Sequence, residues 1–202
     1  MTYVAERTGG ADGAPLIFTF HGTGGNEHQF HRLASDLVPG AHVVSPRGDV
    51  SEMGANRYFR RTGEGVYDMD DLWARAKAMA AFMEAEKVRV GAERVIALGY
   101  SNGANILVAV MLIRPDLVDD AILMHPLIPW SPEAQPGLEG KRVLITAGRY
   151  DPICPAPLTE ALEGYLKAQG ADVATHWHEG GHELRQDELV AIQSFLAVSA
   201  EV

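Results

Sequence analysis

Residues 99–103 read Gly99-Tyr100-Ser101-Asn102-Gly103, and this stretch decides the fold. It follows a short apolar run at 95–98 and precedes an apolar segment with good helix formers. G-x-S-x-G between a strand and a helix predicts a sharp turn that lifts the serine above the end of a sheet. Glycine is required on both sides because other side chains would collide with neighbouring backbone. Ser101 is therefore the first candidate for a reactive residue.

Apolar runs and amphipathic segments alternate along the rest of the chain. The runs are continuous, which is typical of strands in a parallel sheet covered on both faces. The pattern predicts strands over 16–20, 42–45, 95–98, 121–124, 143–146 and 173–178, helices over 29–38, 70–88, 102–113, 157–168 and 186–198, and an added edge strand over 3–8. Asp70 or Asp71 is expected to cap the longest helix.

These elements predict one α/β domain over residues 1–202, with a mostly parallel central sheet and helices on both faces. The least regular region is 47–66, which contains four glycines. A long loop in a compact domain is usually functional or poorly ordered. This one is too short to form a separate cap domain.

The composition of the chain argues against two classes of binding partner. The chain has 202 residues, with 27 acidic and 17 basic side chains and a formal net charge of −10. Nucleic acid and anionic membrane surfaces both demand basic patches, so neither is expected as a partner. Charged residues arrive before any apolar run at the N-terminus, which argues against a signal peptide. The single cysteine, Cys154, permits no intramolecular disulfide. We expect a cytoplasmic protein.

A serine hydroxyl is a weak nucleophile and needs a base. For this kind of strand–turn–helix serine, the chain order is serine, then an acid, then histidine. Asp151 follows the apolar run at 143–147, so it should lie at the same sheet edge as Ser101. The acidic residues at 116, 119 and 120 precede a strand and should lie at the opposite edge. His182 lies in the loop after the last strand, which completes a predicted Ser101, Asp151, His182 triad.

The stretch His178-Glu179-Gly180-Gly181-His182 also matches H-E-x-x-H, a zinc-binding pattern. That pattern requires a helix, so that both histidines share one face. Two adjacent glycines inside a helix cost about 2 kcal/mol relative to alanine. The preceding residues, 173–177, read as a strand. We therefore expect neither a metal site nor a cofactor.

A glycine-rich loop, His21-Gly22-Thr23-Gly24-Gly25-Asn26, follows the first buried strand. Such a loop brings backbone N–H groups towards a reacting carbonyl. The N–H groups of Thr23 and Asn102 are the predicted oxyanion donors. Phosphate binding is the alternative, but there is no G-K-[ST], and Glu27 stands where G-x-G-x-x-G needs its third glycine.

These motifs, with Gly148-Arg149-Tyr150-Asp151-Pro152, resemble the phospholipase/carboxylesterase family of α/β-hydrolases over nearly the whole chain. The resemblance implies a lidless serine esterase without a cofactor, often a homodimer. Thioesterases and lysophospholipases of that family usually have Gln followed by two glycines after the nucleophile. Here the residues are Asn102-Gly103-Ala104, which favours small esters over long-chain lipids or protein thioesters.

We therefore predict a serine carboxylesterase that acts on small to medium carboxylic esters. The alternatives are an acyl thioesterase or lysophospholipase, and a non-catalytic ligand-binding protein on the same fold. Dienelactone hydrolysis is disfavoured, because it would usually call for cysteine at position 101.

The candidates for the substrate pocket are Tyr58, Phe59, Leu127 and Trp130. Arg57, Arg60 and Arg61 either meet an anionic substrate or lie on a solvated loop. Cys154 is either a redox-sensitive thiol or, as the simpler interpretation, a buried structural residue.

Overall fold

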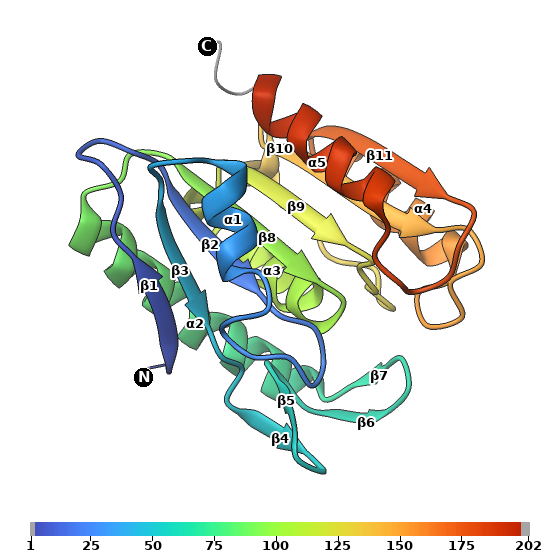
Figure 1. Cartoon of the computed structure of the whole chain (residues 1–202). Coiled ribbons are helices and arrows are strands. Elements are labelled where there is room, and N and C mark those ends of the chain that lie inside the picture. The colour runs from blue at the N-terminus through green and yellow to red at the C-terminus, as the bar shows by residue number, and fades with distance from the viewer. Residues whose placement is uncertain (1–2, 199–202) are drawn as a thin grey trace.

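The computed structural model describes residues 3–198 and is built on a seven-stranded sheet (Figure 1). Its strand order is β1-β3-β2-β8-β9-β10-β11. Every neighbouring pair is parallel except β1 and β3, so the predicted mostly parallel sheet with an added edge strand is confirmed. The strands are β1 (Ala5–Thr8), β2 (Leu16–Phe20), β3 (His42–Pro46), β8 (Val95–Tyr100), β9 (Asp120–Met124), β10 (Arg142–Gly148) and β11 (Asp172–His178).

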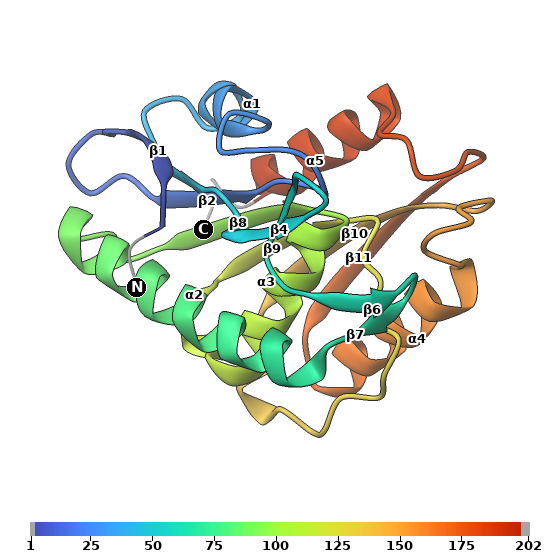
Figure 2. The ribbon, with the colours of Figure 1, turned by 90° about the horizontal axis from the view of Figure 1, so that it is seen from below.

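Helices cover both faces of this sheet (Figure 2). One face carries α1 (His31–Leu37) and α5 (Gln186–Val198), and the other carries α2 (Met69–Val90), α3 (Asn102–Ile113) and α4 (Ala156–Ala168). A separate hydrophobic cluster fills each side, which explains why the strands are apolar on both faces. Short 3₁₀ turns, η1 (Pro115–Leu117) and η2 (Pro136–Leu138), lie in the connections. Among the described residues, no helix has both the length and the apolar character needed to cross a bilayer.

The cap of α2 differs from the prediction. Asp68, rather than Asp70 or Asp71, stands at the N-cap, and its side chain accepts a hydrogen bond from the Asp71 N–H at 3.1 Å. The two predicted residues lie in the first turn, where their negative charge still favours the helix N-terminus. The helix ends at Val90, and the C-cap residue Gly91 supplies the left-handed conformation with a φ of 67°.

The region expected to be an irregular loop forms two small hairpins instead. These are β4 (Val50–Glu52) with β5 (Ala55–Arg57), and β6 (Arg61–Gly63) with β7 (Val66–Tyr67). Met53 and Gly54 both have positive φ, 49° and 88°, and form the two-residue turn of the first hairpin. These hairpins stand beside the carboxyl ends of the central strands (Figure 1). No periodic apolar pattern marks such short strands, so the sequence could not predict them.

Candidate active site

The turn after β8 has the geometry that the sequence predicts. Ser101 adopts φ 52° and ψ −118°, and α3 begins at the next residue. A Cβ on Gly99 would lie 2.6 Å from the Gly103 carbonyl oxygen, and one on Gly103 would lie 2.3 Å from the Phe20 carbonyl oxygen. Both glycines are therefore required by close backbone contacts, and the strained turn holds the serine at the carboxyl end of the sheet.

Ser101, His182 and Asp151 form a continuous hydrogen-bonded line. The Ser101 Oγ lies 2.9 Å from His182 Nε2, and His182 Nδ1 lies 2.7 Å from Asp151 Oδ2. The other oxygen, Oδ1, accepts the backbone N–H groups of Ile153 and Cys154 at 2.8 and 2.9 Å. Burial alone would raise the pKa of Asp151, but the hydrogen bonds from two histidines, His125 and His182, hold it well below its usual range. Asp151 is thus an ionised carboxylate that fixes the His182 ring.

The loop after β2 brings Thr23 to the same place. Within residues 3–198, the backbone N–H groups of Thr23 and Asn102 donate no hydrogen bond, and both residues border one cavity together with Ser101. The Thr23 hydroxyl accepts a hydrogen bond from Arg57 Nη1 at 2.7 Å. Two free N–H groups beside a nucleophile are the arrangement that stabilises an oxyanion.

His21 secures the base of that loop. Its Nδ1 donates to the Gly22 carbonyl at 2.7 Å, and its Nε2 accepts the Gly48 N–H at 2.9 Å. Burial lowers the pKa of His21, so the ring is neutral and one nitrogen is free to accept. The loop is therefore tied to the segment that leads into the hairpins.

The cavity has a volume of about 310 Å³ and is partly open to solvent. Tyr67 shapes one wall, because its hydroxyl donates to the Leu127 carbonyl at 2.8 Å and accepts from Asn105 Nδ2 at 2.9 Å. That size suits a small molecule. The lining residues outside the triad are Thr23, Arg57, Arg61, Glu64, Gly65, Tyr67, Tyr100, Asn102, Asn105, Leu127, Ile153 and Cys154.

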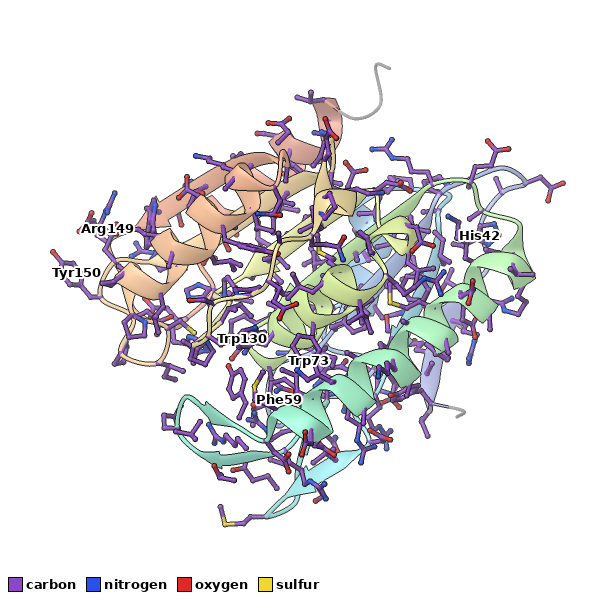
Figure 3. All side chains as sticks on the ribbon, turned by 180° about the vertical axis from the view of Figure 1, so that it is seen from behind. His42, Phe59, Trp73, Trp130, Arg149 and Tyr150 are labelled. Atoms are coloured by element: carbon purple, nitrogen blue, oxygen red, sulfur yellow. The ribbon has the colours of Figure 1, made fainter. Side chains whose placement is uncertain are left out.

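Of the four residues expected to bind substrate, only Leu127 lines this cavity. Tyr58 is buried in the core, where its hydroxyl donates to the Pro46 carbonyl at 2.8 Å and accepts the His21 N–H at 3.1 Å. Phe59 is fully buried. Trp130 packs edge-on against Trp73 at a ring distance of 5.9 Å (Figure 3) and does not line the cavity. The expectation for Tyr58, Phe59 and Trp130 is corrected: large apolar rings in this region are used for packing.

The arginines separate into two groups. Arg57 and Arg61 line the cavity, whereas Arg60 is exposed outside it and pairs with Asp68 and Asp71. The two cavity arginines share Glu52 as an ion-pair partner, at 3.3 and 3.0 Å. Cys154 is buried, its Sγ lies 3.2 Å from the His125 carbonyl oxygen, and burial raises the pKa of its thiol. A buried, protonated thiol fits the structural interpretation of this residue.

A second set of polar side chains lies buried behind Asp151. His125 Nδ1 lies 2.9 Å from Asp151 Oδ2, and its Nε2 lies 3.1 Å from Glu188 Oε2. Burial alone would lower the pKa of His125, but hydrogen bonds to these two carboxylates raise it to about 9. The sequence contained one signal for it: His125 directly follows β9, at the sheet edge that carries Ser101 and Asp151.

Side chains of metal-binding type gather here, in the groups His125, Asp151 and His182, and His125, His178 and Glu188. Their nitrogen and oxygen atoms face one another at hydrogen-bonding distance, so protons shared between imidazoles and carboxylates account for the contacts. The H-E-x-x-H stretch runs from the end of β11 into a loop and is not helical. His182 faces Ser101 while His178 faces Glu188, so the two histidines do not share one site.

The chain is similar to known hydrolases in sequence and in fold. Residues 47–188 match the model of the dienelactone hydrolase family. The chain is 41% identical to "Putative hydrolase MhqD" of Bacillus subtilis (strain 168) over 175 residues, covering 86% of this chain and 88% of that one. The protein Atu2452 of Agrobacterium tumefaciens str. C58, of unknown function, superposes with a TM-score of 0.92 at 53% identity over 97% of this chain and 96% of that one.

A carboxylesterase of Bacillus cereus superposes with a TM-score of 0.91 at 34% identity, over 98% of this chain and 94% of that one. The α/β-hydrolase fold and the resemblance drawn from the sequence motifs are both confirmed. The chain belongs to the dienelactone hydrolase family and is a hydrolase of the dienelactone hydrolase and carboxylesterase type.

Proposed function

We propose that this hydrolase is a serine carboxylesterase that cleaves small to medium carboxylic esters through an acyl-enzyme on Ser101. The observation that carries the proposal is the hydrogen-bonded line from Ser101 through His182 to Asp151, with two free N–H groups beside Ser101. Each group has the position that its role requires. The similarity to a carboxylesterase at 34% identity supports the same reaction class.

The reaction follows from these positions in two steps. The Ser101 Oγ attacks the ester carbonyl carbon while its proton passes to His182 Nε2, and the N–H groups of Thr23 and Asn102 stabilise the oxyanion. The carbon–oxygen bond to the leaving alcohol then breaks, and His182 returns the proton to that oxygen. In the second step His182 deprotonates a water that attacks the acyl carbon. The carboxylic acid leaves and Ser101 recovers its proton.

The cavity argues for small substrates over the lipid alternatives. Its volume of about 310 Å³ is at the lower end of small-molecule sites. A serine at position 101, where dienelactone hydrolysis would usually call for cysteine, favours ordinary esters within the family. The free N–H groups and the aligned triad argue against a non-catalytic binding protein, since binding alone needs neither.

The test is the turnover of p-nitrophenyl esters of increasing chain length, with acyl-CoA thioesters in parallel. We expect the largest kcat/KM on acetate and butyrate, little on palmitate or acyl-CoA, and none above background for Ser101→Ala. A strong preference for palmitate or acyl-CoA would contradict the substrate class. Equal turnover by Ser101→Ala would contradict the mechanism.

A further inference from the structure

Asp151 is shared between two histidines, which an ordinary triad does not require. Its Oδ2 lies 2.7 Å from His182 Nδ1 and 2.9 Å from His125 Nδ1. The two imidazole rings meet edge to face, with centroids 5.2 Å apart. Both rings therefore contact a single carboxylate oxygen. The charge that His125 carries affects the Asp151 carboxylate, which in turn holds His182.

His125 itself is held between two buried carboxylates. Its side chain has no exposure, and those of Asp151 and Glu188 are 1% exposed. An ionised carboxylate only accepts hydrogen bonds, so each ring nitrogen of His125 must donate. A neutral ring would leave one nitrogen lone pair against a carboxylate oxygen in a region closed to water, which is costly. The contacts with the two carboxylates therefore favour an imidazolium.

Glu188 is built as the counter-charge of that imidazolium. Its Oε2 also accepts the Thr146 hydroxyl at 2.6 Å, and its Oε1 accepts the Arg185 N–H at 2.7 Å. His178 Nε2 lies 3.3 Å from Oε1 and 3.5 Å from His125 Nε2, and its own Nδ1 has no partner among the described residues. Three hydrogen-bond donors, from His125, Thr146 and Arg185, converge on Glu188, so its carboxylate stays ionised.

The backbone at His125 is shaped to place this ring. His125 has a φ of 50°, in the left-handed region that non-glycine residues rarely occupy. Its N–H donates to the Thr146 carbonyl at 2.8 Å, and its carbonyl oxygen lies 3.2 Å from Cys154 Sγ. The Tyr100 ring packs against it at 5.9 Å, and the Tyr100 hydroxyl donates to the His182 carbonyl at 2.7 Å. Strained backbone that the surroundings hold in place is typical of functional sites.

We propose that His125 is a positioning residue of the active site that is protonated at neutral pH, fixes the Asp151 carboxylate for His182 and has Glu188 as its counter-charge. The three charges sum to one negative charge, the same as a lone triad aspartate. His125 therefore restrains the carboxylate without cancelling its support for a protonated His182. The effect on catalysis rests on the proposed function, whereas the charge state of His125 does not.

The charge state is tested directly by NMR of histidine ring nitrogens in the unaltered protein, with the His125 signals assigned through their loss in His125→Asn. Asparagine tolerates the left-handed backbone and offers a neutral donor. We expect both ring nitrogens of His125 to carry protons at about pH 7.5, and Glu188→Gln to lower the pH at which one is lost. A neutral His125 ring at that pH would overturn the proposal whether or not the protein cleaves esters.

The positioning role is tested by a double-mutant cycle in ester hydrolysis. His125→Asn should lower kcat by about tenfold with little change in KM, because a misplaced carboxylate misorients the base. In an Asp151→Asn background the same substitution should lower kcat by less than about twofold, because the carboxylate through which His125 acts is already removed. His31→Asn is the matched control, a buried histidine bonded to Thr8 and Ser45 that should leave kcat unchanged. Equal losses in both backgrounds would reduce His125 to a folding role and overturn the proposal.

Discussion

Ser101 and His182 are separated by 81 residues in the chain, yet their Oγ and Nε2 atoms lie 2.9 Å apart. The contact exists because β8 and β11 end at the same edge of the sheet, although β9 and β10 stand between them. Parallel strands place the residues that follow them side by side. The site therefore depends on the close packing of the sheet ends, and the first prediction concerns that packing.

Gly103→Ala should damage both stability and activity. The added Cβ would lie 2.3 Å from the Phe20 carbonyl oxygen, so β2 and α3 must separate. We expect a loss of about 2 kcal/mol or more in the free energy of unfolding by urea, and of most esterase activity. Gly164→Ala is the matched control: Gly164 lies in α4 with open space around it, and alanine there should be neutral or stabilising. Equal effects of the two substitutions would contradict the steric argument.

Arg57→Lys should impair the oxyanion loop. Arg57 is buried and donates to the Thr23 hydroxyl at 2.7 Å and to the Phe59 carbonyl at 3.2 Å. A lysine ammonium lacks the planar fork needed to reach both acceptors, so the Thr23 N–H loses its fixed position. We expect kcat on p-nitrophenyl butyrate to fall by about tenfold. Arg60→Lys is the control and should leave kcat unchanged, because Arg60 lies outside the cavity; an unchanged kcat in Arg57→Lys would refute the role.

Loss of the His125 charge should make the protein less stable in alkali. Its pKa of about 9 lies above its ordinary 6.5, so its charge stabilises the fold fully below pH 6.5 and less as the pH rises through about 9. The contribution is roughly 3 kcal/mol at most. Urea unfolding should show this loss between about pH 6 and about pH 9.5 in the unaltered protein and a smaller loss in His125→Asn. Identical losses in both proteins would assign the alkaline effect to other groups.

The sequence predicts that Ser101, Asp151 and His182 come together because the three residues obey a topological rule. Asp151 and His182 follow strands that run in the same direction as the strand before Ser101, so chain order and strand direction suffice to bring them together. The same rule excludes the acidic residues at the opposite edge. The loop that carries Thr23 follows the same logic, since it begins directly after β2.

What the sequence does not predict depends on contacts between distant segments. Tyr58 and Phe59 are aromatic residues of the kind that line substrate pockets, and only the tertiary structure reveals that they are buried. His125 follows a buried strand just as Ser101 does, but its charge depends on Glu188, 63 residues away on α5. A single sequence contains no pattern for such a pair, because neither residue lies in a motif.

The most direct measurement is covalent labelling of the intact protein with a fluorophosphonate probe, followed by mass spectrometry of the protein and of its peptides. An activated Ser101 should form one adduct, located on the peptide that contains residue 101, and Ser101→Ala should form none. Prior incubation with a short-chain ester should slow the labelling, because the acyl-enzyme occupies the same oxygen. No adduct on the folded protein, or an adduct that persists in Ser101→Ala, would contradict the assignment of Ser101 as the nucleophile.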